Sequence, residues 1–260
     1  MRENYKKHNE TFWNKQAQAN QEWSMPVSSE LISKAKEGDW EVYILPSPLD
    51  KSWLGDIKGK RILCLASAGG QQAPILAAAG GIVTVFDLSQ GQLDKDKTVA
   101  VRDGLSMQIV QGDMMDLSYF EEESFDIIIH PISNLYVENV VKVWKECYRV
   151  LRNGGRLLSS FYNPVVFVGN RKAKYLEQGV IKPEYKIPYA DRKDLTKDEL
   201  SIKIEKGEAI VFGHSLQDLI GGQLKEGFYI KAFQEDWQPN PRFLIDNYIP
   251  TFIATLAIKF

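Results

Sequence analysis

Small residues follow an apolar run in the first third of the chain, in the sequence Ser67-Ala68-Gly69-Gly70. Small side chains let a backbone approach a bound molecule, and the N–H groups that open a following helix can hydrogen-bond to it. Asp87 lies 17 residues after Gly70, at the end of the next apolar run. A carboxylate there can accept hydrogen bonds from both ribose hydroxyls. The spacing predicts a nucleotide-type binding site, although the turn alone also suits an ordinary tight connection.

A second acidic residue stands in the sequence Gly112-Asp113-Met114. The Asp113 carboxylate can accept a hydrogen bond from an adenine amino group, and Met114 or Met115 can pack on the face of the ring. Gly-Asp is also a common turn dipeptide. Because this one follows a predicted strand, we prefer the interpretation as a binding residue.

Alternating strands and helices position these residues. Strands are predicted at 61–66, 82–86, 106–111, 124–129 and 156–162, and helices at 74–79, 89–103 and 138–151. Ser89 and Gln92 have the spacing of a capping box, and Asn153-Gly154-Gly155 is expected to stop the third helix. The alternation is typical of a parallel sheet covered by helices. Its carboxyl edge, where open α/β sheets bind ligands, would carry the acids and the small-residue turn.

The last quarter of the chain departs from this pattern. A helix is predicted at 215–226 and strands at 228–233 and 249–260. The short connection between these strands leaves little room for a crossover helix, so an antiparallel pair is expected. Residues 1–55, and the Lys-, Tyr- and Pro-rich residues 163–207, also fall outside the alternation. They are either surface decoration or a lid over the sheet edge, and both interpretations remain open.

Composition excludes several classes of protein. The 260 residues are 44% hydrophobic, and 32 basic against 34 acidic residues give a net charge of −2, so no nucleic-acid partner is expected. Cys64 and Cys147 are too few for a disulfide framework and indicate a reducing compartment. The polar N-terminus is not a secretory signal, and no apolar run nears the ~20 residues of a membrane helix. No His, Cys or Asp grouping has metal-ligand spacing. A cytoplasmic enzyme that acts away from membranes is the expectation.

Residues 60–162 resemble the class I, Rossmann-like S-adenosylmethionine-dependent methyltransferases, in particular the small-molecule branch that includes the quinone-biosynthesis enzymes. The family's motifs match residues 62–70, Asp87, Asp113, residues 124–128 and residues 150–155. The resemblance implies an α/β fold with a doubly wound, mostly parallel seven-stranded sheet and a C-terminal antiparallel strand. It implies a single domain, with an N-terminal helical lid at 1–55, a cofactor-binding core at 56–162, an insertion over the acceptor at 163–207, and closing strands at 208–260.

The resemblance also implies a site for S-adenosylmethionine. The residues expected to contact this cofactor are Ala66, Ser67, Ala68, Gly70, Asp87, Leu88, Asp113, Met114, Met115, His130, Trp13 and Trp23. The two tryptophans could face the sulfonium, whose positive charge favours an aromatic ring, or fill a seam beside the sheet. Asn134, Tyr136 and Tyr162 are expected to line the acceptor site.

His130 follows the fourth core strand, a position that lies near the transferred methyl group in this family. It could act as a catalytic base or hold the acceptor, but we prefer a histidine bonded to backbone at a strand end. His8 and His214 belong to no motif, and surface or capping roles are expected for them.

Three positions depart from the family's glycine-rich motif. Cys64 replaces an acid that often orients the methionine end of the cofactor, and Ala66 and Ala68 replace glycines. Alanine disfavours a positive φ. The expected function is transfer of a methyl group to a small-molecule acceptor by in-line displacement. The alternatives are a non-catalytic nucleotide-binding module and a nicotinamide-dependent oxidoreductase, which would need a parallel sixth strand.

Overall fold

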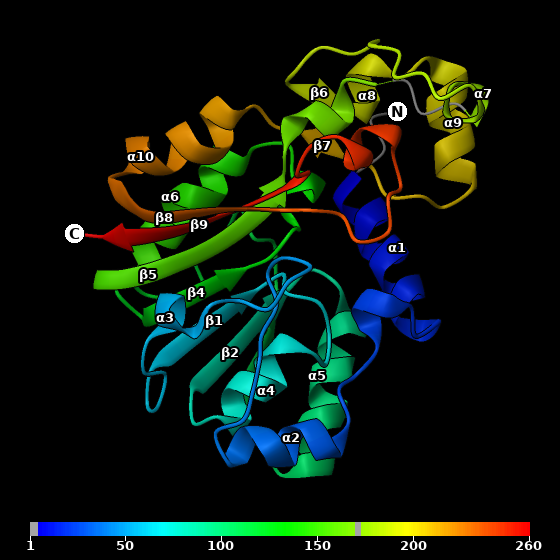
Figure 1. Ribbon diagram of the computed structural model, residues 1–260. Coiled ribbons are helices and arrows are strands. Elements are labelled where there is room, and N and C mark those ends of the chain that lie inside the picture. Colours follow the sequence, from blue (N-terminus) through cyan, green and yellow to red (C-terminus); the bar gives the residue numbers. More distant parts are fainter. Residues whose placement is uncertain (1–4, 170–172) are drawn as a thin grey trace.

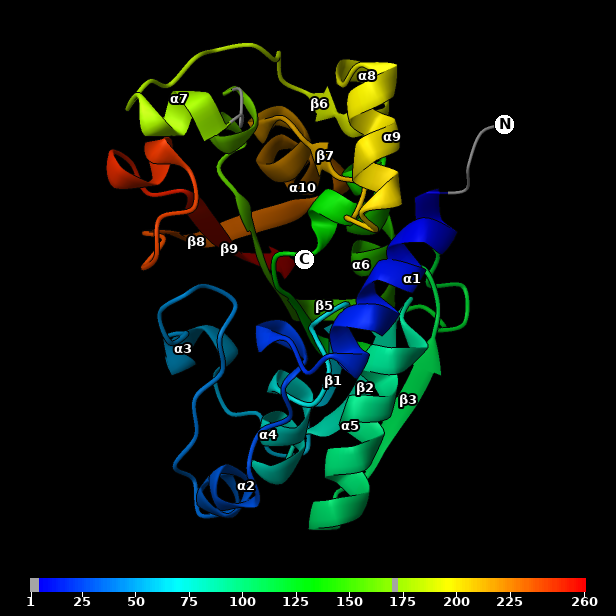
Figure 2. The same cartoon turned by 90° about the vertical axis from the view of Figure 1, so that its right-hand side faces the viewer.

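A computed structural model describes residues 5–169 and 173–260, and its centre is one seven-stranded sheet (Figures 1 and 2). The strand order is β3-β2-β1-β4-β5-β9-β8. The strands are β1 (Arg61–Leu65), β2 (Ile82–Asp87), β3 (Met107–Gln111), β4 (Phe125–His130), β5 (Leu151–Tyr162), β8 (Phe228–Asp236) and β9 (Phe252–Lys259). The first five are parallel, and β9 is antiparallel to both β5 and β8. The predicted fold class is confirmed.

The direction of winding reverses between β1 and β4, which are neighbours in the sheet. In open α/β sheets the crevice at such a reversal, beyond the carboxyl ends of the strands, binds ligands. The turn after Leu65 and the residues after His130 both lie at this crevice. The fold therefore brings the predicted chemistry to one edge.

Helices cover both faces of the sheet, which explains why its central strands are apolar throughout. On one face lie α2 (Ser29–Lys36), α4 (Gln72–Ala78) and α5 (Gln90–Asp103), packed on Ile62, Cys64 and Ile129. On the other lie α6 (Val140–Val150) and α10 (Gly222–Glu226), and α6 packs on Leu63, Leu65 and Ile128 (Figure 1). Alternate residues of β1 thus enter different cores.

The N-terminal segment contains α1 (Tyr5–Gln18), the short turn η1 (Glu22–Ser24), α2, and α3 (Lys51–Leu54). Figure 2 shows α1 beside the upper end of α5. After β5 come η3 (Pro164–Phe167), α7 (Ala173–Glu177), β6 (Tyr189–Ala190), α8 (Asp191–Asp194), α9 (Lys197–Glu205) and β7 (Phe212–Gly213). Since β7 pairs with β6, this covering segment continues past residue 207. Residues 1–4 of the expected lid and 170–172 of the expected insertion lie outside the described residues.

One local prediction is wrong. The helix expected to stop at Asn153-Gly154-Gly155 ends at Val150, and those three residues lie within β5. There Arg152 is hydrogen-bonded to Asp126 of β4, which holds the chain against the sheet. The helix expected at 215–226 is present, as a π-helical turn, η4 (Gln217–Gly221), that continues directly into α10. In the described residues, no helix has both the length and the apolarity needed to cross a membrane.

Candidate functional site

The turn between β1 and α4 has an unusual backbone. Ala66, Ala68 and Gly70 have φ values of 47°, 66° and 74°, all in the left-handed region. An L-residue there is strained by about 1–2 kcal/mol. Two backbone bonds hold the turn: Ala66 N–H donates to the Phe86 carbonyl at 2.8 Å, and Val27 N–H donates to the Gly70 carbonyl at 2.8 Å. Strain of this kind is characteristic of functional sites.

Helix α5 packs directly beneath this turn. A Cβ at Gly69 would lie 2.3 Å from the Gln92 carbonyl oxygen, so only glycine fits there. Gly70 N–H donates to Asp96 Oδ1 at 2.9 Å. Asp96 is fully buried, and Oδ2 has no partner among the described residues. Burial raises the pKa of this carboxyl well above its usual range.

Asp96 was missed by the sequence reasoning, and so was its relation to Cys64. Burial, and next the negative charge of Asp96, raise the pKa of the Cys64 thiol. The Asp96 carboxyl of α5 therefore raises the pKa of Cys64, the residue that stands where the family motif usually has an acid. The signal was present in the sequence, because Leu93, Asp96 and Val99 share one buried stripe of α5.

Asp87 ends β2 and is partly exposed. Its Oδ1 accepts a hydrogen bond from Ser89 N–H at 2.7 Å, and burial raises the pKa of Asp87 to about 6. Leu88, also partly exposed, follows it. Ser89 caps α5 by accepting from Gln92 N–H at 3.2 Å, whereas the Gln92 side chain donates to Ser24 Oγ at 2.6 Å. The predicted capping box is thus only half formed.

Asp113 lies after β3, and its carboxylate is held from both sides. Oδ1 accepts from Met115 N–H at 2.9 Å, and Oδ2 lies 2.5 Å from Lys6 Nζ of α1. Met114 is buried in the core, and Met115 is partly buried against it. Near Asp87, Asn14 Oδ1 of α1 accepts from Gly91 N–H at 2.8 Å. Helix α1 therefore bridges the ends of β2 and β3 (Figure 2).

His130 has no exposed surface. Its Nδ1 lies 3.0 Å from the Leu65 carbonyl, which makes Nδ1 the protonated nitrogen, and its ring meets the edge of Trp144 with centroids 5.8 Å apart. Burial lowers the pKa of His130 to about 4, and Nε2 has no partner among the described residues. The preferred backbone-bonded interpretation fits this ring. The roles of His130 as a catalytic base or an acceptor contact stay predictions.

The two tryptophans have different environments. Trp13 of α1 meets Tyr136 edge to face, with ring centroids 5.4 Å apart. Trp23 is 54% exposed. Trp13 lies over the residues that follow β4, and the expectation that the two indoles face the cofactor stays a prediction.

The predicted acceptor residues also separate into two kinds. Asn134, in the 3-10 turn η2 (Asn134–Tyr136), is buried, and its amide donates to the Ser160 carbonyl at 2.8 Å. It is thus engaged by the protein itself. Tyr162 is hydrogen-bonded to Arg242, whose guanidinium carbon lies 5.3 Å from the centre of the Tyr162 ring. Burial, and then the proximity of Tyr162, raise the pKa of Tyr136. Arg242 was missed, because it lies 80 residues after Tyr162 in a connection without a motif.

Within the described part of the chain, no group of three or more His, Cys, Asp or Glu side chains could hold a metal ion. The geometry is instead that of an organic ligand site. The strained turn, Asp87 and Asp113 lie at the ends of the adjacent strands β1, β2 and β3. Beside them, Tyr136 of η2 lies near Tyr162 and Arg242.

Known proteins are similar to this chain in sequence and in fold. Residues 63–159 match the family model described as "Methyltransferase domain". The chain is 47% identical to "Uncharacterized methyltransferase YbaJ" of Bacillus subtilis, over 97% of each chain. It is 33% identical to a demethylmenaquinone methyltransferase of Clavibacter sepedonicus, over 42% of this chain and 44% of the other.

Solved structures agree on the fold. An S-adenosylmethionine-dependent methyltransferase from Mesorhizobium loti superposes with a TM-score of 0.58 at 17% identity, covering 80% of this chain and 95% of the other. A putative enzyme of the same description from Listeria monocytogenes gives 0.59 at 21% identity, with 81% and 95% covered. At these identities the likeness concerns the fold.

Proposed function

Since the chain belongs to the class I S-adenosylmethionine-dependent methyltransferases, we propose that it transfers the methyl group of S-adenosylmethionine to a small-molecule acceptor. The observation that carries the proposal is the meeting of the 66–70 turn, Asp87 and Asp113 at one sheet edge. The small-molecule acceptor is supported by the relative that is named as a demethylmenaquinone methyltransferase. Cys64 and Cys147 are free thiols, which supports a cytoplasmic location.

The residues present fit this cofactor. The buried Ser67 hydroxyl has, among the described residues, no hydrogen-bond partner other than the neighbouring Cys64 thiol, so it keeps the capacity to serve a ligand at the turn. We propose that Ala66, Ser67, Ala68 and Gly70 line the methionine end. Asp87 would accept from the ribose hydroxyls beside Leu88. Asp113, steadied by Lys6, would face the adenine together with Met115, while Met114 supports them from the core.

We propose that Asp96 compensates for the acid that Cys64 replaces. It holds the Gly70 N–H directly, and its charge is felt at the Cys64 thiol. Its free Oδ2 leaves hydrogen-bonding capacity beneath the turn. Asp96 therefore acts as a positioning residue, one that sets the shape of the turn from α5.

The mechanism needs few chemical groups from the protein. S-adenosylmethionine supplies a sulfonium methyl that is already activated for in-line displacement. The chain contributes approach geometry and exclusion of water. Helix α1 and the segment after β5 cover the sheet edge, and Tyr136, Tyr162 and Arg242 are the proposed acceptor contacts. The His130 Nδ1–H holds the Leu65 carbonyl where the turn begins.

The alternatives fit less well. A nicotinamide-dependent oxidoreductase would carry a parallel sixth strand, whereas β9 is antiparallel and lies between β5 and β8. A non-catalytic binding module would bind the cofactor but methylate no acceptor. Methyl transfer to any acceptor would therefore exclude this alternative.

Calorimetric titration of Asp87→Ala with S-adenosylhomocysteine tests the proposal. Loss of the ribose acceptor should weaken binding at least tenfold, while Asp94→Ala, an exposed carboxylate on α5, serves as the matched control. Equal affinity in the wild type and Asp87→Ala would contradict the proposal.

A further inference from the structure

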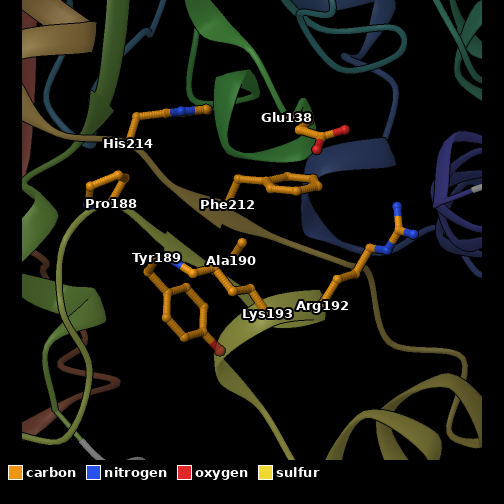
Figure 3. Close-up of a pocket in the computed structure, with 8 residues that line it drawn as sticks. All are labelled: Glu138, Pro188, Tyr189, Ala190, Arg192, Lys193, Phe212 and His214. Atoms are coloured by element: carbon orange, nitrogen blue, oxygen red, sulfur yellow. The ribbon is translucent and has the colours of Figure 1, made fainter. Parts of the chain in front are cut away.

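A half-open hollow of about 470 Å³ lies between the segment after β5 and the residues that follow β4 (Figure 3). It is outside the cofactor edge, and no motif in the sequence pointed to it. The lining side chains that matter here are Glu138, Tyr189, Arg192, Lys193, Phe212 and His214. A volume of this size accommodates a small organic molecule.

The floor of the hollow is aromatic and preorganised. Phe212 and Tyr189 are both buried. The Phe212 ring packs edge to face on Tyr5, with centroids 5.1 Å apart, and the Tyr189 ring is stacked on Phe167 at 5.7 Å. Because these rings are already fixed by neighbours, an apolar ligand body would bind to them without ordering them first.

The rim carries positive charge that the protein does not neutralise. Arg192 and Lys193 are exposed, and within residues 5–169 and 173–260 neither forms a salt bridge. The Arg192 guanidinium lies 5.9 Å from the centre of the Tyr5 ring. Figure 3 shows the two side chains leaving α8 in different directions, Arg192 toward the side of Glu138 and Lys193 toward Tyr189.

The neighbouring acids are engaged elsewhere. Asp191 is buried, accepts from Val211 N–H at 2.7 Å and pairs with Lys203 at 3.3 Å. Asp194 accepts from Ala190 N–H at 2.7 Å. Among the described residues that line the hollow, the charged side chains are Arg192, Lys193 and Glu138, so two cations face one acid. His214 is neutral at pH 7, since burial lowers its pKa.

The hollow adjoins the proposed transfer site. His214 Nε2 lies 3.0 Å from the Asn134 carbonyl of η2. Glu138 N–H donates to the Tyr5 hydroxyl at 3.3 Å, and Lys6, the next residue of α1, pairs with Asp113. The turn η2 and the start of α1 thus separate the hollow from the cofactor edge and belong to both.

We propose that this hollow is a second ligand site, separate from the proposed acceptor contacts Tyr136, Tyr162 and Arg242, and that its ligand carries a carboxylate on an aromatic or other apolar body. The apolar body lies on Phe212 and Tyr189, and the carboxylate lies at the rim, where Arg192 and Lys193 offer charge-assisted hydrogen bonds. Glu138 also lines the hollow and opposes the anion.

The test uses matched probes on the full chain saturated with S-adenosylhomocysteine. 2-Naphthoate should bind saturably in a calorimetric titration, and the neutral 2-naphthamide at least fivefold more weakly. The double substitution Arg192→Ala and Lys193→Ala should weaken naphthoate at least fivefold and leave the amide unchanged. Glu138→Gln should tighten naphthoate about twofold. Lys197→Ala, an exposed cation of α9 outside the hollow, is the control and should change nothing.

Several outcomes would overturn the inference. Equal affinity for naphthoate and naphthamide, or an equal loss in Lys197→Ala, would remove the role of the two cations. Tighter binding of 2-naphthyl phosphate than of naphthoate would replace the carboxylate by a phosphate. If S-adenosylhomocysteine binds and naphthoate does not, this inference alone fails. If S-adenosylhomocysteine does not bind, the proposed function fails whatever naphthoate does.

Discussion

Replacing the two alanines of the 66–70 turn by glycine should stabilise the protein. Ala66 and Ala68 have φ values of 47° and 66°, a conformation that costs an L-residue about 1–2 kcal/mol. Glycine relieves this cost but loses about 0.5–1 kcal/mol through its greater freedom in the unfolded chain. The central values of these two ranges differ by a gain of about 0.75 kcal/mol at each site, or about 1.5 kcal/mol for the double variant.

The assay is thermal unfolding of the wild type and of Ala66→Gly/Ala68→Gly, followed by circular dichroism. At about 2–4 °C per kcal/mol for a chain of this size, Tm should rise by about 3–6 °C. Ala100→Gly within α5 is the matched control, and it should lower the free energy of unfolding by about 1 kcal/mol. A double variant less stable than the wild type would refute the left-handed geometry of both alanines.

Three further predictions follow from ionisable groups whose pKa values are shifted. Asp87 has a pKa raised to about 6, and its ionised form is the better ribose acceptor, so binding of S-adenosylhomocysteine should be about tenfold weaker at pH 5 than at pH 8. Calorimetry over that range should show no such dependence for Asp87→Asn. Asp96 has a raised pKa, so it binds more protons folded than unfolded and its contribution to stability declines as pH rises above the unfolded value near 3.8. Urea unfolding of Asp96→Asn should show a smaller decline between pH 5 and pH 8, and this variant should bind S-adenosylhomocysteine more weakly, whereas a purely structural role would leave affinity intact. His130→Ala should lower the free energy of unfolding by about 2–4 kcal/mol, because it leaves a cavity beside Trp144 and an unpaired Leu65 carbonyl. Any surviving methyl transfer should keep its pH profile, and loss of a titration near neutrality would show that the ring acts as a base.

The sheet was predictable because its signals are local. The three isoleucines at 127–129 can be apolar in succession only where both faces of a strand are covered, and they are fully or almost fully buried. Asp87 and Asp113 could be predicted as site residues because each stands at the carboxyl end of a predicted strand, which is also a local signal. The short link before the last strand was enough to predict the antiparallel pair, and β9 bears it out.

The misses depend on distant contacts. Asp96 reads as an ordinary helix residue until the Gly70 N–H is placed against it, and Arg242 becomes part of the site only through Tyr162. The face of the sheet toward which the His130 side chain points could have been predicted from the alternation of side chains along a strand. His130 stands two residues after Ile128, so strand alternation puts both side chains on the face covered by α6.

The central claim is that the strained turn and the two acids bind S-adenosylmethionine. Calorimetric titration of the purified full chain with S-adenosylmethionine, S-adenosylhomocysteine and NADH in parallel tests it most directly. We expect micromolar binding of the first two ligands and none of NADH. Binding of NADH alone, or of none of the three, would contradict the account.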